Sequence, residues 1–326
     1  MSTQDANGVL AATNPDQKRV VEDSKVWTTL ITNTAYLSGL LTLDASLKLV
    51  DSKYPLIALY TDTFPQEGKD ALDKRKIPRK RIPYLLPKTH KDFTNDPRFY
   101  DCWSKLTPFS LVEYERVVQL DSDMLVLQNM DELMDLPLDG PETLGKGSRV
   151  FAASHACLCN PLGKPHYPKD WIPENCAFTQ QHGEPEKAQV EGVSSGFGIT
   201  MPNGGLQVVV PSAAVYEQIL GALQKEETAS YDFSDQSLLG DLFYGRWVAL
   251  PYIYNALKTL RWKGVHDAIW RDDKVKNVHY ILSQKPWDET EADIAKPGRD
   301  GSNQWWWNIS NRRLKDENAE GIEDGF

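Results

Sequence analysis

Residues 117–126 read Val-Val-Gln-Leu-Asp-Ser-Asp-Met-Leu-Val, an apolar run that leads into two aspartates one residue apart. Branched apolar residues in a short run favour a buried strand. In an open α/β sheet, ligands bind at the carboxyl ends of the strands. Asp121 and Asp123 would present hard carboxylate oxygens there, which suit Mg²⁺ or Mn²⁺. This stretch therefore predicts a strand that ends at a divalent metal site, although acidic pairs also occur on solvated turns.

Strand and helix patterns flank this stretch on both sides. Residues 26–31 and 55–61 form short apolar runs, and an amphipathic stretch over residues 36–50 lies between them. Strand, helix and strand at this spacing indicate a βαβ unit and a mainly parallel sheet. A further strand over residues 207–210 is followed by a helix that begins after Pro211-Ser212. The predicted fold class is α/β.

The chain has 326 residues and a net charge of −10, with 40% hydrophobic residues. We expect a disordered leader over residues 1–24, one catalytic domain over 25–314 with an insertion at about 145–200, and an acidic tail over 315–326. The negative charge disfavours general nucleic-acid binding. No apolar run is long enough to span a membrane. The polar N-terminus has no secretory signal, so we expect the protein in the cytoplasm.

A second candidate ligand lies near the end of the chain. His279 ends a β-branched stretch, and Lys285 follows six residues later. A histidine nitrogen beside the two aspartates would favour Mn²⁺ over Mg²⁺. A lysine there would neutralise a diphosphate. The segment taken alone is more typical of a structural histidine in a loop.

The expected insertion is rich in cysteine and histidine. It contains His155, Cys157, Cys159, His166, Cys176 and His182. These residues could bind zinc, but their spacing matches no standard structural zinc site. Packed thiols and loop histidines are therefore the favoured interpretation.

In this order, the motifs resemble those of glycosyltransferase family 8, the retaining enzymes with a GT-A fold that use UDP-sugars and include glycogenin and galactinol synthase. Residues 30–36 are similar to the family's nucleotide-binding strand and turn, and Lys105 to the lysine that approaches the donor. Residues 203–206 and 231–236 resemble its Asn-x-Gly strand and its Asp-x-x-Asp-Gln loop. His279 follows Asn255 at the family's spacing.

The resemblance implies a Rossmann-like GT-A fold and a retaining hexosyltransferase that depends on Mn²⁺ (or Mg²⁺). The implied metal ligands are Asp121, Asp123 and His279. The implied catalytic residues are Asp235, Gln236 and Asp232. The implied donor-binding residues are Leu30, Thr32, Asn33, Tyr36, Lys105, Asp121, Ser122, Asp123, Asn203, Gly204, Leu282 and Lys285.

The resemblance also implies the partners, which are a UDP-sugar carrying glucose or galactose and a separate carbohydrate, polyol or other small acceptor. A homodimer is compatible with it. Three positions depart from the family. Leu282 stands where a small residue, usually glycine, is found, and Arg98 lies near but not at the offset of the donor arginine. Trp262 replaces the tyrosine that glycogenin glucosylates, so we expect a fungal-type member that is not a self-priming glycogenin.

Two alternatives stay open at this point. The chain could be a sugar-nucleotide or carbohydrate-binding protein that has lost turnover, although every expected metal ligand is retained. It could also be a nucleotidyltransferase. That class normally has a glycine-rich phosphate loop after the first strand, and residues 30–38 contain no glycine.

Overall fold

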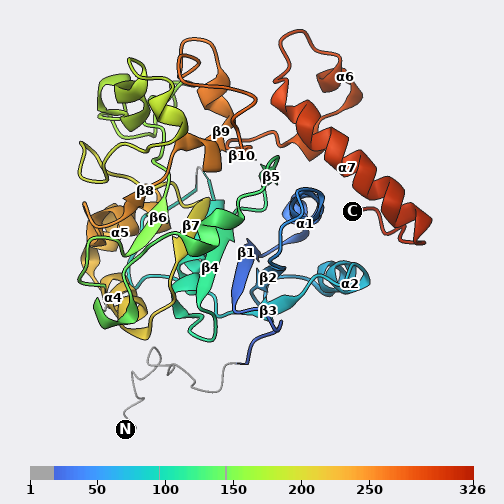
Figure 1. Cartoon of the computed structure of the whole chain (residues 1–326), viewed down its shortest axis with the longest axis horizontal. Coiled ribbons are helices and arrows are strands. Elements are labelled where there is room, and N and C mark those ends of the chain that lie inside the picture. The colour runs from blue at the N-terminus through green and yellow to red at the C-terminus, as the bar shows by residue number, and fades with distance from the viewer. Residues whose placement is uncertain (1–17, 95, 144) are drawn as a thin grey trace.

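The computed structural model describes residues 18–94, 96–143 and 145–326. Its main sheet has seven strands in the order β3-β2-β1-β4-β7-β6-β8, and a smaller sheet has the order β5-β10-β9 (Figure 1). The strands are β1 (Lys25–Ile31), β2 (Leu56–Tyr60), β3 (Arg79–Arg81), β4 (Arg116–Leu120), β5 (Met124–Val126), β6 (Phe151–Ala153), β7 (Leu206–Val209), β8 (Val248–Ala249), β9 (Ala256–Leu257) and β10 (Asn277–His279). The α-helices are α1 (Leu37–Leu49), α2 (Gln66–Lys74), α3 (Arg98–Cys102), α4 (Ala213–Leu223), α5 (Ser234–Leu242), α6 (Glu291–Ile294) and α7 (Ser302–Ala319).

The predicted βαβ unit is confirmed. Strand β1 pairs in parallel with both β2 and β4, and α1 connects β1 to β2. Strand β7 joins the other side of β4 in the antiparallel direction. Successive residues of β4 point to opposite faces, so Val118 packs in the cluster that contains Leu43 of α1, whereas Val117 packs with Ile57 and Leu111. The strand is buried on both faces, as its continuous apolar run predicted.

The small sheet places the end of β10, with His279, next to the Asp-x-Asp motif at the end of β4. Strand β5 begins at Met124, directly after the Asp-x-Asp motif, and β10 runs antiparallel to it with His279 opposite Met124. The register therefore places the end of β10 beside the carboxyl end of β4. Two glycines permit this close packing. A side chain at Gly39 of α1 would collide with the carbonyl oxygen of Ser122, and one at Gly205 would collide with the His279 ring.

The C-terminal segment is folded onto the domain. Helix α7 continues through the expected boundary at residue 314 and ends at Ala319. Arg75 of α2 donates to both carboxylate oxygens of Glu317 and of Asp324, at 2.8–2.9 Å. Trp306 is buried and packs against Trp287 with ring centroids 5.5 Å apart. We expected residues 315–326 to form an acidic tail separate from the domain, but ion pairs from Arg75 to Glu317 and Asp324, which local sequence patterns do not reveal, hold this segment at the end of α2.

The two remaining expectations concern the start of the chain and the membrane. Residues 1–17 of the expected leader lie outside the described residues. Within residues 18–24, the Arg19 side chain donates to the Glu113 carbonyl at 2.6 Å. Among the described residues, no helix combines the length and the apolar character that crossing a membrane requires.

Candidate active site

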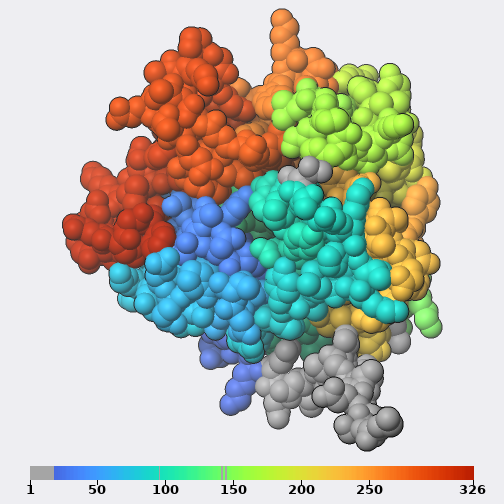
Figure 2. Space-filling model, turned by 180° about the vertical axis from the view of Figure 1, so that it is seen from behind, coloured from blue at the N-terminus to red at the C-terminus, as the bar shows by residue number. Residues whose placement is uncertain are grey.

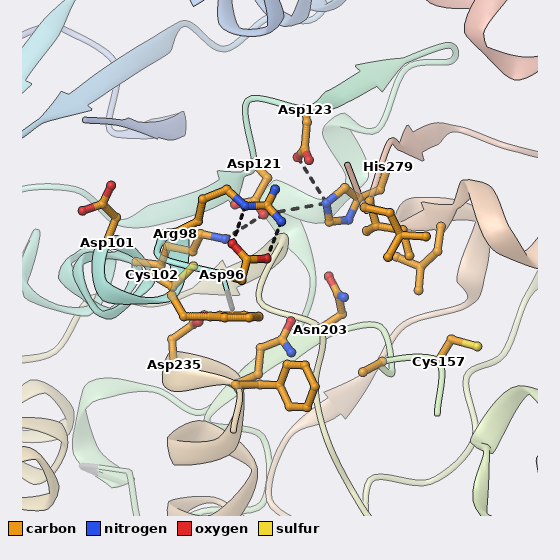
Figure 3. A pocket seen from close by; sticks show the side chains of 18 of the residues that line it. Asp96, Arg98, Asp101, Cys102, Asp121, Asp123, Cys157, Asn203, Asp235 and His279 are labelled. Carbon is orange, nitrogen blue, oxygen red and sulfur yellow. Dashed lines mark hydrogen bonds and ion pairs between the residues drawn. The ribbon is translucent and has the colours of Figure 1, made fainter. Parts of the chain in front are cut away.

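A pocket lies at the carboxyl edge of the central strands (Figure 3). One wall is formed by the end of β1 and the turn after it, and a second by α3 and the start of the following 3-10 helix (Trp103–Ser110). The Asp-x-Asp loop, the start of α5 and residues 279–285 complete the polar end. The loop after β6 covers the opposite side. The site therefore lies where an open α/β sheet is expected to bind its ligand.

Asp121, Asp123 and His279 converge in this pocket, and Figure 3 shows their side chains pointing toward one another. His279 Nε2 lies 3.2 Å from Asp123 Oδ1 and 3.7 Å from Asp121 Oδ2. One ligand atom from each residue lies within 4.8 Å of the others. Two carboxylates and an imidazole at this spacing fit a divalent ion such as Mn²⁺ or Mg²⁺.

The orientation of His279 is fixed from behind. Asn255 is buried, and its carboxamide oxygen lies 2.9 Å from His279 Nδ1. The amide group of Asn255 in turn donates to Asn203 Oδ1 at 2.9 Å, which identifies the oxygen as the atom that faces the histidine. Because that oxygen can only accept, Nδ1 carries a proton, which leaves Nε2 as the nitrogen that would bind a metal ion. This is the tautomer that a metal ligand requires.

Two lysines face the two aspartates, and Lys285 is buried whereas Lys105 is half-buried. Lys105 Nζ donates to Asp121 Oδ2 at 2.7 Å, and Lys285 Nζ donates to Asp123 Oδ2 at 2.6 Å. Burial would raise the pKa of Asp123, but the charges of Lys285 and His279 hold that pKa well below its ordinary value. Burial would likewise lower the pKa of Lys105, yet Asp121 raises it well above the usual range. Asp123 is therefore ionised and Lys105 is charged at neutral pH.

Asp235 differs from Asp123, the other buried aspartate of the pocket. It is 2% exposed, and burial raises its pKa to about 7, with Lys105 opposing the rise and Asp121 adding to it. Its Oδ2 accepts a long hydrogen bond of 3.4 Å from Gln207 Nε2. Its neighbour Gln236 accepts from the Gly204 amide at 2.9 Å. A carboxyl group with this pKa changes protonation near neutral pH.

The predicted donor and catalytic residues mostly gather here. The predicted residues that line the pocket are Leu30, Thr32, Asn33, Tyr36, Lys105, Asp121, Ser122, Asp123, Asn203, Asp235, Gln236, His279, Leu282 and Lys285. Gly204 lies behind Gln236 and contributes its amide. Asp232 was predicted to be catalytic, but its carboxylate pairs with Lys91 and does not line the pocket. Its partner Lys91 lies 141 residues away in the chain, so sequence spacing could not reveal this contact.

Leu282 keeps a backbone shape that suits glycine. Its φ is +73°, in the left-handed region that costs an L-residue with a side chain about 1–3 kcal/mol. The residue lines the pocket. The departure from glycine therefore adds an apolar side chain to the pocket and leaves the turn itself unchanged.

Several pocket residues were not predicted from the sequence. Arg98, noted only for its offset, donates to the Tyr36 hydroxyl at 2.6 Å and pairs with Asp96. Asp101 accepts from the Thr32 hydroxyl at 2.7 Å. These contacts join α3 to the turn after β1. They depend on tertiary packing, and the five-residue helix that carries them has no apolar periodicity to reveal which face is inward.

Aromatic side chains form the covering wall. Trp171 and Phe233 stack with ring centroids 4.3 Å apart and an interplanar angle of 9°. Tyr167 packs edge-on against both of these rings. Trp171 and Tyr167 come from the expected insertion, and all three residues line the pocket. The insertion is therefore part of the site, and it supplies aromatic side chains to the pocket lining.

Comparison with known proteins agrees with this arrangement. No protein-family model matches the chain. Galactinol synthase 1 of Arabidopsis thaliana is 28% identical over 313 residues, which cover 94% of this chain and 85% of the relative. Galactinol synthase 1 of Solanum lycopersicum is 27% identical over 303 residues, with 90% and 84% covered.

Solved structures show the same fold at lower identity. The galactosyltransferase LgtC, solved with donor and acceptor sugar analogues, has a TM-score of 0.54 and 14% identity, with 88% of this chain and 96% of that chain covered. The glycosyltransferase GlyE of Streptococcus pneumoniae has a TM-score of 0.54 and 16% identity. That comparison covers 92% of this chain but 65% of the GlyE chain, just under two thirds.

The fold and the relatives together define a GT-A-type glycosyltransferase. The chain is more particularly a homologue of the galactinol synthases of glycosyltransferase family 8. The predicted GT-A fold is thus confirmed, and the predicted resemblance is confirmed by galactinol synthase homologues at 27–28% identity over most of the chain.

Proposed function

We propose that the protein transfers a hexose from a UDP-sugar to a separate small acceptor, with a divalent metal ion and with retention at the anomeric carbon. The observation that carries the proposal is the convergence of Asp121, Asp123 and His279 with two charged lysines at one end of an aromatic-walled pocket. Hard metal ligands beside paired cations suit a diphosphate, and stacked rings suit a sugar.

The pocket offers a separate place for each part of the donor. Leu30, Thr32, Asn33 and Tyr36 at the end of β1 would receive the uridine. Lys105 and Lys285 would offset the charge of the diphosphate. A bound Mn²⁺ or Mg²⁺ would stabilise the developing charge on the UDP leaving group. Asp121, Asp123 and His279 would hold that ion, and Asn255 would keep the histidine lone pair directed at it.

The sugar would lie between the acidic and the aromatic sides of the pocket. Asp235 and Gln236 at the start of α5 line the pocket, and so do Trp171 and Phe233. Because Asp235 is buried, it would bind sugar hydroxyls in a site with little competing water. Its assignment as a catalytic residue, and the retention itself, remain proposals that rest on the family resemblance.

The acceptor is proposed from the relatives and from the shape of the pocket. The names of the relatives describe synthesis of galactinol. We therefore rank UDP-galactose as the first donor and a polyol as the first acceptor to examine. An aromatic wall built largely by the insertion is compatible with an acceptor of this size. We still predict that the protein is cytoplasmic. A homodimer is compatible with the proposed function.

A donor screen tests the proposal. UDP-galactose, UDP-glucose and UDP-N-acetylglucosamine are incubated with protein, Mn²⁺ and a panel of polyols and sugars, and UDP release and product mass are measured. We expect one donor to give a hexosylated polyol, and NMR of its anomeric proton to report the donor's configuration. UDP-sugar binding without transfer to any acceptor would favour the non-catalytic alternative.

The proposal also excludes self-priming. Trp262 has no hydroxyl, and its indole N–H donates to Asp300 at 3.1 Å, outside the pocket lining. Self-glucosylation requires a hydroxyl held within reach of the anomeric carbon. Intact-mass spectrometry after incubation with UDP-glucose and Mn²⁺ should show an unmodified protein. A ladder of hexose additions traced to one tyrosine would contradict this part of the proposal.

A further inference from the structure

A second cluster of ligating side chains lies outside the proposed metal site. Cys157 and Cys159 follow β6, Cys176 precedes the 3-10 helix Ala177–Gln181, and His266 lies in the loop between β9 and β10. Their four ligand atoms lie within 4.8 Å of one another. Cys176 and His266 have no exposed surface. The two chain segments that carry these residues lie side by side at the top of the molecule in both views (Figures 1 and 2).

The distances match the edges of a tetrahedron. His266 Nε2 lies 3.5 Å from Cys157 Sγ, 3.2 Å from Cys159 Sγ and 3.5 Å from Cys176 Sγ. Zinc bonds of about 2.3 Å to sulfur and about 2.0–2.1 Å to nitrogen give a sulfur–nitrogen edge of about 3.5 Å in a tetrahedral site. One ring nitrogen can donate at most one proton, so hydrogen bonding cannot satisfy three sulfurs at once. A cation at the centre can.

The histidine is oriented as a ligand. His266 Nδ1 lies 2.8 Å from His182 Nε2. If Nδ1 donates to His182, Nε2 presents its lone pair to the three sulfurs, as a metal-bound imidazole does. Phe178 packs edge-on against the His266 ring at 5.5 Å. All four cysteines of the chain are free, so no disulfide competes for these sulfurs.

We propose that Cys157, Cys159, Cys176 and His266 hold a structural zinc ion that ties the insertion to the loop before β10. Three thiolates and one imidazole are soft and borderline ligands, which select zinc over the hard ions that suit the aspartate site. Four protein ligands close the coordination shell, so the ion has no open position for a substrate. Its role is therefore to hold structure.

The zinc ion would fix the aromatic wall of the pocket. Cys157 itself lines the pocket, and the chain between Cys159 and Cys176 carries Tyr167 and Trp171. Residues 157–176 have little regular structure beyond a short 3-10 helix (Pro173–Asn175). Because Cys157 and Cys159 stand at one end of this segment and Cys176 at the other, one shared metal ion would hold both ends together. It would thereby restrict a loop that contains no strand. This inference stands whether or not the transfer reaction is as proposed.

Metal analysis of the full chain tests the proposal. The protein is purified without chelators, and zinc is measured by inductively coupled plasma mass spectrometry, with no donor or acceptor present. We expect about one zinc ion per chain in the wild type and in Asp123→Asn, which changes the other metal group. Cys159→Ser and His266→Ala should lose that ion. The matched substitutions Cys102→Ser and His166→Ala should keep it, because Cys102 lies outside the cluster and His166 is exposed.

Two measurements on the wild type keep the test decisive if a ligand variant fails to fold. Cobalt should replace zinc and give thiolate charge-transfer bands together with the visible spectrum of a tetrahedral ion. Native thiol titration should show three protected cysteines that become reactive after the metal is removed. Wild-type protein with well under one zinc per chain, cysteines oxidised to a disulfide, or bound iron in place of zinc would overturn the proposal. Zinc retained by folded Cys159→Ser and His266→Ala would overturn it as well.

Discussion

The two clusters of ligating residues are built in different ways. Asp121, Asp123 and His279 stand at strand ends, where the pairing of β10 with β5 sets their separation. The three cysteines and His266 stand outside the strands, so no strand pairing holds any of these four positions in register. Strand pairing therefore sets the geometry of the first group. In the second group, a bound metal ion would set the geometry by holding the loops together.

The two clusters also differ in how much of the coordination shell they fill. The aspartate group offers three ligands at the wall of a pocket and leaves room for substrate phosphates. The cysteine group offers four soft ligands, two of them without exposed surface. This contrast indicates that an exchangeable ion suits the first group and a permanent ion the second. Each of the following predictions tests that division.

The largest expected effect is on catalysis at the aspartate group. Asp123→Asn should lower the rate of transfer by more than about 100-fold, because even residues that merely orient metal ligands typically contribute 10–100-fold. Asparagine keeps an oxygen for Lys285, whereas alanine would leave that buried lysine without its carboxylate partner. Transfer rates and zinc content are measured on the same preparation. Asp316→Ala, at an exposed position of α7, is the control.

Chelation should separate the two groups in the wild type. Brief treatment with EDTA should abolish transfer, and added Mn²⁺ should restore it, because three ligands at an open pocket release their ion readily. The zinc content should stay near one ion per chain during the same treatment. Activity that survives full removal of Mn²⁺ and Mg²⁺ would contradict the role given to the aspartate group.

Asp235, a buried residue of the pocket, should make the free energy of unfolding depend on pH. Its folded pKa of about 7 exceeds its ordinary value of 3.8, so the folded state binds more protons between these values. In metal-free protein, this group therefore lowers stability as the pH rises from about 4 to about 7. The full penalty is at most about 4 kcal/mol above pH 7.

Asp235→Asn should remove this dependence. Urea unfolding at pH 5 and pH 8 should show a smaller loss of stability in the variant than in the wild type. Because other groups titrate too, the difference between the two proteins is the quantity of interest. If the unfolding free energies of the two proteins changed equally with pH, the pKa of Asp235 would not be raised in the folded state. Zinc content should not change.

Asn255 should act as a positioning residue for His279. Asn255→Ala removes the acceptor that fixes the histidine tautomer, so Mn²⁺ affinity and transfer rate should fall by about 10–100-fold. Raising the Mn²⁺ concentration should recover much of the lost rate, which a purely structural defect would not allow. Zinc content is again the internal control.

The smallest expected effect lies away from both groups. Arg75→Ala breaks the pairs with Glu317 and Asp324, but Glu317 keeps Arg313 and Asp324 keeps Lys74 as partners. We expect a loss of about 1–2 kcal/mol of unfolding free energy, since the charges are only partly buried. Transfer rate and zinc content should be unchanged. A loss of either would show that the C-terminal anchor supports the site.

The sequence by itself determined the sheet and the polar end of the pocket. Strands β1, β2, β4 and β7 and helices α1 and α4 lie where their patterns predicted, because apolar periodicity reports burial within a single element. Asp121 and Asp123 could be assigned to a site because they follow a buried strand directly. His279 and Lys285 required the family resemblance, since a lone histidine in a loop has many uses.

Only the tertiary structure decided which distant side chains meet. His266 joins three cysteines that lie 90 to 109 residues away in the chain, and no local pattern marks it as their partner. Local patterns likewise do not show that Asp232 pairs with Lys91 outside the pocket, or that ion pairs hold residues 315–326 against the domain. Loops have no repeating period that reports their buried side, so their contacts are fixed by packing, ion pairs and ligands when the chain folds.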